Sequence, residues 1–210
     1  MARQDDYFNA ARIAKEMLAQ KHFDDIRLRT GFSSPEDNVF HISFLDKKFR
    51  VTYPDFEFTV DPHAPDVKDA PPPIQEQVLI LHYMMGAIDR PLSDNWIAYR
   101  EIKDASFYFN VFVKRAIDPL KKVFGANIDG FSKIAGKLGG TSLKFGDAGF
   151  EFFLFPRIPL HLILWEGDEE FPPEANILFN DTIAGMLSGE DIAWLSGFLV
   201  YRMIALFYQR

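Results

Sequence analysis

Hydrophobic residues in the opening segment recur close to the 3.6-residue period of a helix, at Phe8, Ala11, Ile13, Met17 and Leu18. Asp5 and Asp6 precede them and suit the positive end of a helix dipole. The period then changes to two, because apolar and polar side chains alternate in residues 26–32, 39–45, 49–53 and 56–60. This alternation predicts an antiparallel meander with one buried, Phe-rich face.

A proline-rich segment separates this meander from a helical middle. Residues 61–73 carry five prolines and no apolar period, which predicts an extended connecting loop. Residues 74–87 predict a helix with a core stripe, whereas residues 96–102 fit either a short helix or an ordered loop. Further helices are expected from Ser106, from Asp118-Pro119 and after Asn127, the last of them ending at Gly139-Gly140.

The alternating pattern returns in residues 141–145, 150–155 and 160–166, and Phe179 is expected on an edge strand. Ser188 and Asp191 form a capping-box pair that predicts the start of a last helix, reaching to Tyr208. One sheet split by a helical insertion and two separate sheets both fit these patterns.

The expected fold class is therefore α+β, with antiparallel meanders in the N- and C-terminal halves around a central helical segment, closed by a C-terminal helix. We expect a single domain over residues 1–210. Its expected subdivisions are a meander (1–62), a helical part (74–140) and a meander plus helix (141–210).

The amino-acid composition excludes several classes of function. The chain has no cysteine, which excludes a disulfide framework, a Cys-ligated zinc site and a thiolate nucleophile. The net charge of −7 argues against nonspecific nucleic-acid binding. No membrane span is expected, because the nearest candidate, residues 192–208, contains Arg202 and fits a buried helix. The opening segment carries acids and no apolar run, so we expect no secretory signal and a cytoplasmic location.

The densest polar cluster follows the last long strand, in residues 165–174 (WEGDEEFPPE). Its carboxylates, which include Glu166, Asp168 and Glu169, fit a site for a hard cation, an acid–base pair or a solvated acidic loop. His161 shares a strand face with Ile163 and Trp165. It fits a base or ligand beside this loop, or a partly buried residue with a local hydrogen bond.

The other candidate sites have less specific sequence patterns. Trp96 and Arg100 fit the wall of a pocket or an anchor on the core. A metal site from His82, His161 and Glu166 has no recognisable spacing, so no metal is assigned. Residues 136–142 look like a phosphate loop but end a helix rather than begin one. The chain contains no nucleophile elbow, G-x-G-x-x-G or HExxH motif, and the sequence assigns no cofactor.

Residues 159–179 (PLHLILWEGDEEFPPEANILF) resemble the signature stretch of the domain-of-unknown-function family 3786, and the proline-rich residues 70–73 before Leu81-His82-Tyr83 are similar too. The resemblance covers nearly the whole chain. It implies an origin in mainly anaerobic bacteria and archaea, and some relatives carry a cysteine-rich, iron–sulfur-like segment. This chain has none, so a redox role would require a partner. The family implies no established activity, hence no catalytic residue is carried over.

The sequence favours a noncatalytic ligand- or protein-binding accessory module that uses residues 165–174, with residues 96–100 as a recognition rim. The alternative is a metal-assisted hydrolase or lyase, with Glu166, Asp168 and His161 as the reacting groups. A homodimer through the apolar face of the last helix is compatible with both. The expected partner is a small molecule or a protein.

Overall fold

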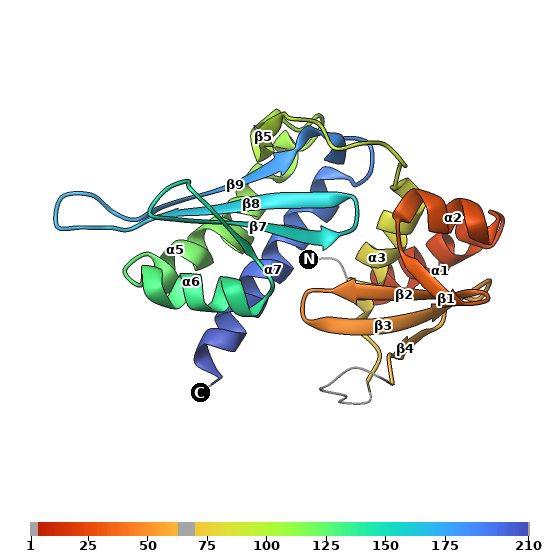
Figure 1. The fold of residues 1–210 in the computed structure, drawn as a ribbon. Coiled ribbons are helices and arrows are strands. Elements are labelled where there is room, and N and C mark those ends of the chain that lie inside the picture. The colour runs from red at the N-terminus through yellow and green to blue at the C-terminus, as the bar shows by residue number, and fades with distance from the viewer. Residues whose placement is uncertain (1–3, 63–69, 210) are drawn as a thin grey trace. The chain divides into compact units, whose positions relative to one another are not determined.

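The computed structural model describes residues 4–62 and 70–209 (Figure 1). The chain divides into two compact units, residues 1–91 with 155–157, and residues 92–154 with 158–210. A four-stranded sheet lies in the first unit and a five-stranded sheet in the second. The predicted α+β class with two meanders and a closing C-terminal helix is confirmed, and of the two sheet arrangements the one with separate sheets is correct.

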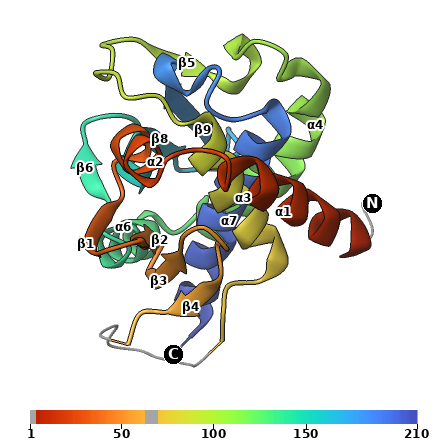
Figure 2. The same ribbon diagram turned by 90° about the vertical axis from the view of Figure 1, so that its right-hand side faces the viewer.

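Three helices lie on one face of the first sheet: α1 (Gln4–Leu18), α2 (Phe23–Thr30) and α3 (Ile74–Gly86). Figure 2 shows α1 and α3 side by side. The helix predicted at the start of the chain is confirmed, but its buried residues are Ala11, Ala14 and Leu18, while Phe8, Ile13 and Met17 are largely exposed. The small alanines allow α1 to approach α3 closely, which the spacing of the larger side chains does not reveal.

Residues 26–32, which the alternation assigned to a strand, are instead mostly the helix α2. Its charges suit the helix dipole, with Asp24 and Asp25 in the first turn and Arg27 in the last. Gly31 ends it with φ of 71°, a left-handed conformation in which its N–H donates to the Arg27 carbonyl. Alternate residues in a short helix can imitate a strand pattern, and here Leu28 is exposed rather than buried.

The first sheet has the order β1 (Ser33–Glu36), β2 (Val39–Phe44), β3 (Lys47–Thr52) and β4 (Phe58–Val60). The predicted Phe-rich buried face is confirmed in Phe40, Ile42, Phe44, Phe49 and Val51. The polar positions lie on the opposite face, where His41 is opposite Arg50 and Arg50 is opposite Thr59. Most of the predicted proline-rich loop, residues 63–69, lies outside the described residues.

The second sheet has the order β5-β9-β8-β7-β6. Its strands are β5 (Trp96–Ala98), β6 (Thr141–Leu143), β7 (Ala148–Phe155), β8 (Ile158–Trp165) and β9 (Glu174–Asn180). The prediction of an edge strand at Phe179 is wrong, because β9 lies between β5 and β8. Residues 96–98 form a strand instead of the expected helix or loop. The buried amide of Asn180 holds this segment, accepting from the Ser93 N–H at 3.3 Å and donating to the Ser93 carbonyl at 2.7 Å.

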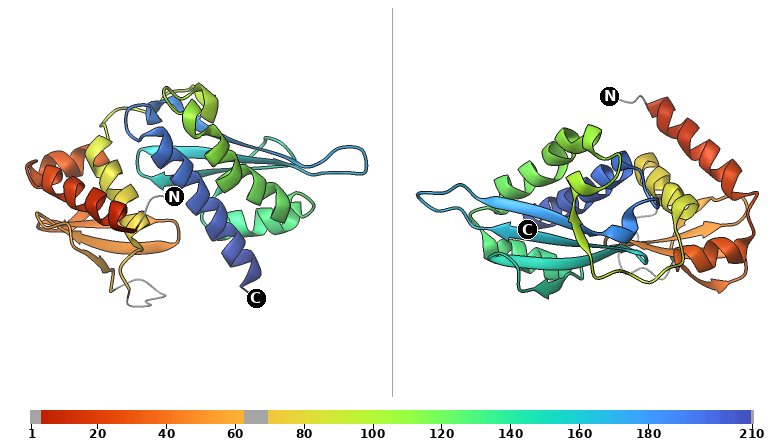
Figure 3. Two further views of the ribbon diagram at one scale, coloured as in Figure 1. Left: turned by 180° about the vertical axis from the view of Figure 1, so that it is seen from behind. Right: turned by 90° about the horizontal axis from the view of Figure 1, so that it is seen from above.

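Helices cover one face of this sheet (Figure 3). A 3₁₀ turn (Tyr99–Glu101) follows β5, and the next helical stretch runs through a second such turn (Ser106–Tyr108), α4 (Phe109–Phe112), a π-helical turn (Val113–Ile117) and α5 (Asp118–Phe124). Next is α6 (Ile128–Lys137), capped as predicted by the Asn127 side chain. A last 3₁₀ turn (Asp181–Ile183) precedes α7 (Gly189–Tyr208), which begins with the predicted Ser188–Asp191 capping box.

The helix α7 is long and apolar enough to cross a membrane by length and composition. Half of the most apolar stretch of α7 is nevertheless buried inside the structure, and Leu195, Leu199 and Met203 are fully enclosed. A core helix of a soluble domain meets the same criterion, so the apolar length of α7 is weak support for a membrane span.

Candidate functional site

His161 lies on the outer face of the second sheet, under an aromatic cover. The Trp96 ring stacks on its imidazole, with centroids 3.4 Å apart and planes 20° apart, and the Phe145 ring lies 6.0 Å away. The register explains the contact: Ala98 and His161 are both opposite Leu178, so that Trp96, two residues before Ala98, lies on the same face. The sheet therefore brings together two residues that the sequence had placed in separate candidate groups.

One imidazole nitrogen of His161 has a partner. Its Nε2 lies 3.2 Å from Glu151 Oε2, while its Nδ1 is buried and forms no hydrogen bond in the part of the chain that is described. Burial lowers the pKa of His161, and the neighbouring Glu151 carboxylate opposes this shift only in part. The neutral ring with its proton on Nε2 satisfies Glu151 and leaves Nδ1 as an enclosed lone pair. In this form His161 is a largely buried, hydrogen-bonded residue.

The acidic hairpin loop, residues 165–174, joins β8 to β9 and protrudes beyond α5 and α6 (Figures 1 and 3). Asp168 shapes its tip: Oδ1 accepts hydrogen bonds from the backbone N–H groups of Glu170 and Phe171 at 2.8 and 2.7 Å. These two bonds lower the pKa of Asp168, because they favour its ionised form. The Asp168 carboxylate thus serves the turn in addition to any ligand.

The base of the acidic hairpin loop is also anchored. The backbone N–H of Glu166 donates to Asp147 Oδ2 at 2.8 Å, and the N–H of Gly167 donates to the Gly125 carbonyl at 2.9 Å. Gly125 has no room for a side chain, since a Cβ there would lie 2.5 Å from Pro173. These contacts attach the base of the loop to the end of α5.

Aromatic rings and carboxylates share the surface of this braced loop. Trp165 is 40% exposed and Phe171 67% exposed. Trp165 is directly opposite Glu174 in the hairpin. The exposed carboxylates are those of Glu166, Asp168, Glu169, Glu170 and Glu174. None of them forms an ion pair within residues 4–62 and 70–209. The loop therefore presents aromatic surface among uncompensated negative charges.

The structure separates the predicted site residues into four places. Trp96 and His161 are together, whereas Trp165, Glu166, Asp168 and Glu169 lie on the acidic hairpin loop. His161 is four residues before Trp165, about 13 Å along an extended strand, which keeps its imidazole away from the loop carboxylates. Arg100 lies apart from Trp96, with its guanidinium 3.7 Å from the centre of the Phe109 ring.

The fourth place is that of His82, one of the metal candidates. His82 lies in α3 of the first unit, and His161 and Glu166 belong to the second. Within the described ranges no group of three or more His, Cys, Asp or Glu side chains is placed to hold a metal ion. The residues therefore supply single donors rather than a metal-ligand set.

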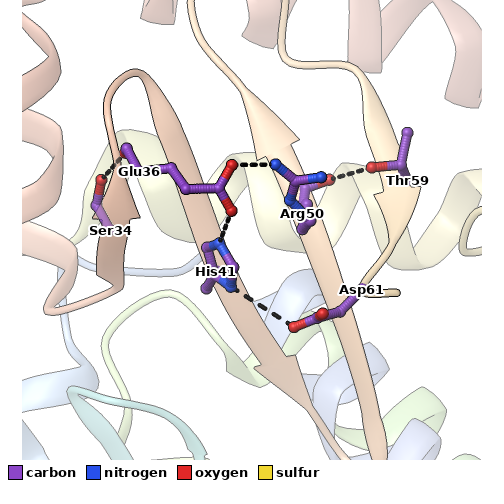
Figure 4. A network of polar contacts seen from close by, with 6 residues as sticks. All are labelled: Ser34, Glu36, His41, Arg50, Thr59 and Asp61. Carbon is purple, nitrogen blue, oxygen red and sulfur yellow. Dashed lines mark hydrogen bonds and ion pairs between the residues drawn. The ribbon is translucent and has the colours of Figure 1, made fainter. Parts of the chain in front are cut away.

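A polar network on the outer face of the first sheet was not predicted (Figure 4). His41 is at its centre, with Nε2 3.2 Å from Glu36 Oε1 and Nδ1 3.5 Å from Asp61 Oδ2. The Arg50 guanidinium pairs with the other oxygen of Glu36. The alternation of apolar and polar residues places His41 and Arg50 on one polar face, and this is the signal in the sequence that points to the network. Glu36 and Asp61 lie outside the predicted strands, so that no spacing pointed to them. The contacts connect three strands, which fits a role in holding the sheet edge.

Comparison with known proteins gives one match. A family model described as "Domain of unknown function (DUF3786)" matches residues 22–202. No curated protein and no solved structure matches the chain. The matched residues include the His161 cluster, the acidic hairpin loop and the network around His41.

Proposed function

We propose a function on the premise that the chain belongs to the domain-of-unknown-function family DUF3786, whose model matches residues 22–202. The protein is a noncatalytic accessory module that binds a lysine- or arginine-rich segment of a partner protein. The binding surface is the acidic hairpin loop, with Trp165 and Phe171 as aromatic contacts and its carboxylates as charge partners. The place of action is the cytoplasm.

One observation carries this proposal: exposed aromatic rings lie among carboxylates that have no cationic partner in the described chain. An ammonium or guanidinium group over an exposed aromatic ring contributes about 0.5–1 kcal/mol. Neighbouring carboxylates add charge-assisted hydrogen bonds to the same cation. A lysine- or arginine-rich segment carries such cations at short intervals, and the loop carries the aromatic rings and carboxylates that bind them.

The braced conformation of the loop supports binding as well. Hydrogen bonds of Asp147, Asp168 and Gly125 already hold the backbone that presents Trp165 and Phe171. Less conformational entropy is lost when a partner binds a surface that is already ordered. The same bonds give Asp168 a structural role through Oδ1, and Glu166, Glu169, Glu170 and Glu174 are the charge partners without such a role.

The proposal is tested with a short peptide of alternating Lys and Gly, titrated into the isotope-labelled full chain and followed by backbone amide chemical shifts. We expect saturable shifts concentrated in residues 165–174. Trp165→Ala should weaken the affinity roughly two- to fivefold, the loss of one exposed cation–aromatic contact. Phe153→Ala removes another exposed aromatic side chain, outside the loop, and should leave the affinity unchanged. A peptide in which Gln replaces Lys should not bind.

Shifts spread evenly over the chain, or equal affinities of the Trp165→Ala and Phe153→Ala variants, would contradict the proposal. The metal-assisted hydrolase or lyase makes a different prediction, namely stoichiometric metal in protein purified without added cations, which elemental analysis measures. The cytoplasmic location is tested by fractionation of cells that produce the chain, with recovery in the membrane or secreted fraction as the contrary result.

A further inference from the structure

A cavity of about 560 Å³ lies on the surface of the first unit, where α1 passes into α2. Its lining residues are Gln20, Lys21, His22, Asp25, Leu28 and Arg29. It is an open hollow at the surface rather than an enclosed cavity. Its position in one unit and its basic side chains distinguish it from the acidic hairpin loop.

The guanidinium of Arg29 is held rigidly at this cavity. Its Nη1 donates to the carbonyls of Met85 at 3.2 Å and Ala87 at 3.1 Å, at the C-terminal end of α3. Its Nη2 is buried and has no hydrogen-bond partner in residues 4–62 and 70–209. Two backbone carbonyls supply only partial negative charge, so most of the positive charge of Arg29 is uncompensated.

Lys21 brings a second cation to the same cavity. The Tyr53 hydroxyl donates to its backbone carbonyl at 2.8 Å, which fixes the position of the residue. The Lys21 ammonium has no carboxylate within ion-pair distance in the described part of the chain. Partial burial and the nearby charge of Arg29 lower the pKa of Lys21, the direction expected for cations that lack a counterion.

Asp25 does not neutralise this pair. It lies four residues from Lys21 and four from Arg29, and it forms an ion pair with neither of them. Gln20 and His22 complete the polar lining and can donate further hydrogen bonds. Leu28 adds an apolar side that is 59% exposed. The cavity therefore combines two cations that form no ion pair in the described part of the chain, the carboxylate of Asp25, further hydrogen-bond donors and a small apolar surface.

We propose that this cavity binds the oxyanion group of a small molecule, a phosphate or a carboxylate, between Lys21 and Arg29. The Lys21 ammonium donates hydrogen bonds to the anion, whereas Arg29, whose Nη1 is bonded to the end of α3 and whose Nη2 is buried, contributes its nearby positive charge. The anion supplies the negative charge that both cations lack, and charge-assisted bonds of this kind are among the stronger polar contacts in proteins. The site goes beyond the proposed function, because its ligand has the opposite charge and binds to the other unit.

The test uses inorganic phosphate and acetate as separate probes, with acetamide as a neutral control, titrated into the isotope-labelled full chain. We expect saturable amide shifts in residues 20–29 with at least one of the two anions and none with acetamide. Saturation by phosphate alone assigns a phosphate ligand, saturation by acetate alone assigns a carboxylate ligand, and both results support the site. Saturation by neither anion overturns it.

Lys21→Met should weaken anion binding at least about tenfold, the loss of one charge-assisted hydrogen bond. Lys48→Met is the matched control, since it removes an exposed lysine on β3 of the same unit and should leave binding unchanged. Lys21→Gln provides a second variant of different side-chain length, and thermal unfolding verifies that each variant is folded. Linear shifts, or equal binding by the Lys21→Met and Lys48→Met variants, would identify an adventitious ion only and refute the proposal.

Discussion

At the residue scale, His161 shows how strand pairing determines the surroundings of a candidate site residue. The strand pattern places His161 on the same face as Trp165, which made it a candidate base beside the acidic loop. The folded chain encloses it between Trp96 and Phe145 and pairs its Nε2 with Glu151. Burial disfavours the imidazolium form, so His161 should make folding sensitive to pH.

We expect the neutral His161 to stabilise the fold less as the pH falls. Its folded pKa is lowered from 6.5, so the unfolded state takes up the proton first. The contribution is complete above pH 6.5 and is lost as the pH decreases from 6.5 towards the folded pKa. Urea unfolding between about pH 7.5 and about pH 5.5 should therefore show a smaller loss of unfolding free energy in His161→Gln than in the unsubstituted chain. His22→Gln, at an exposed position, is the control, and identical pH slopes in all three proteins would refute the prediction.

At the scale of elements, the capping box of α7 is both predicted and observed. Ser188 Oγ accepts from the Asp191 N–H at 3.1 Å, and Asp191 accepts from the Ser188 N–H at 3.3 Å. Ser188→Ala should lower the free energy of unfolding by about 1 kcal/mol, since it leaves a helix N–H without its acceptor. Ser106→Ala is the control, because Ser106 was expected to cap a helix but begins a 3₁₀ turn that has no side-chain cap. Equal midpoints of chemical unfolding for the two variants would show that the box contributes nothing.

Helices and strands were predictable where neighbouring residues carry the signal. They were not predictable where the conformation depends on residues far away in the sequence. Caps and alternation define β2, β3, α6 and α7 within a few neighbouring residues. The strand β5 instead forms by pairing with the distant strand β9, and the Asn180 side chain binds the Ser93 backbone 87 positions away, so no local pattern encodes it. The helix α2 imitates a strand because its apolar side chains alternate over a short length.

The candidate sites follow the same rule. The acidic hairpin loop was predictable because its residues are consecutive. The stacking of Trp96 on His161 was not, since it depends on the pairing of β5 with β9. The cavity proposed to bind an anion was not predictable either, because the carbonyls that hold Arg29 come from the end of α3, 56 and 58 residues away.

At the scale of the whole molecule, a basic peptide can be attracted by the net charge of the chain or by the local charge of the acidic hairpin loop. The chain carries a net charge of −7, so a basic peptide is attracted to the entire protein at low salt. Attraction by net charge alone would not distinguish the acidic hairpin loop from any other acidic surface.

The homodimer through α7 that the sequence allows is a separate prediction, and light scattering at several concentrations tests it.

Two triple variants with the same net charge separate these effects. Glu166→Gln, Glu169→Gln and Glu170→Gln remove three charges from the acidic hairpin loop, whereas Asp37→Asn, Asp55→Asn and Asp104→Asn remove three at exposed turns elsewhere. Asn is tolerated in turns, and Gln keeps the size of Glu, so both proteins should fold with unchanged thermal midpoints. We expect the first variant to lose binding of the Lys-Gly peptide and the second to retain it, because local carboxylates position the cations. Between about 0.05 M and about 0.5 M salt, screening should weaken binding to the unsubstituted chain and leave the contribution of Trp165 as the larger remaining part. Equal losses in the two variants would assign the attraction to net charge and remove the acidic hairpin loop as the binding surface.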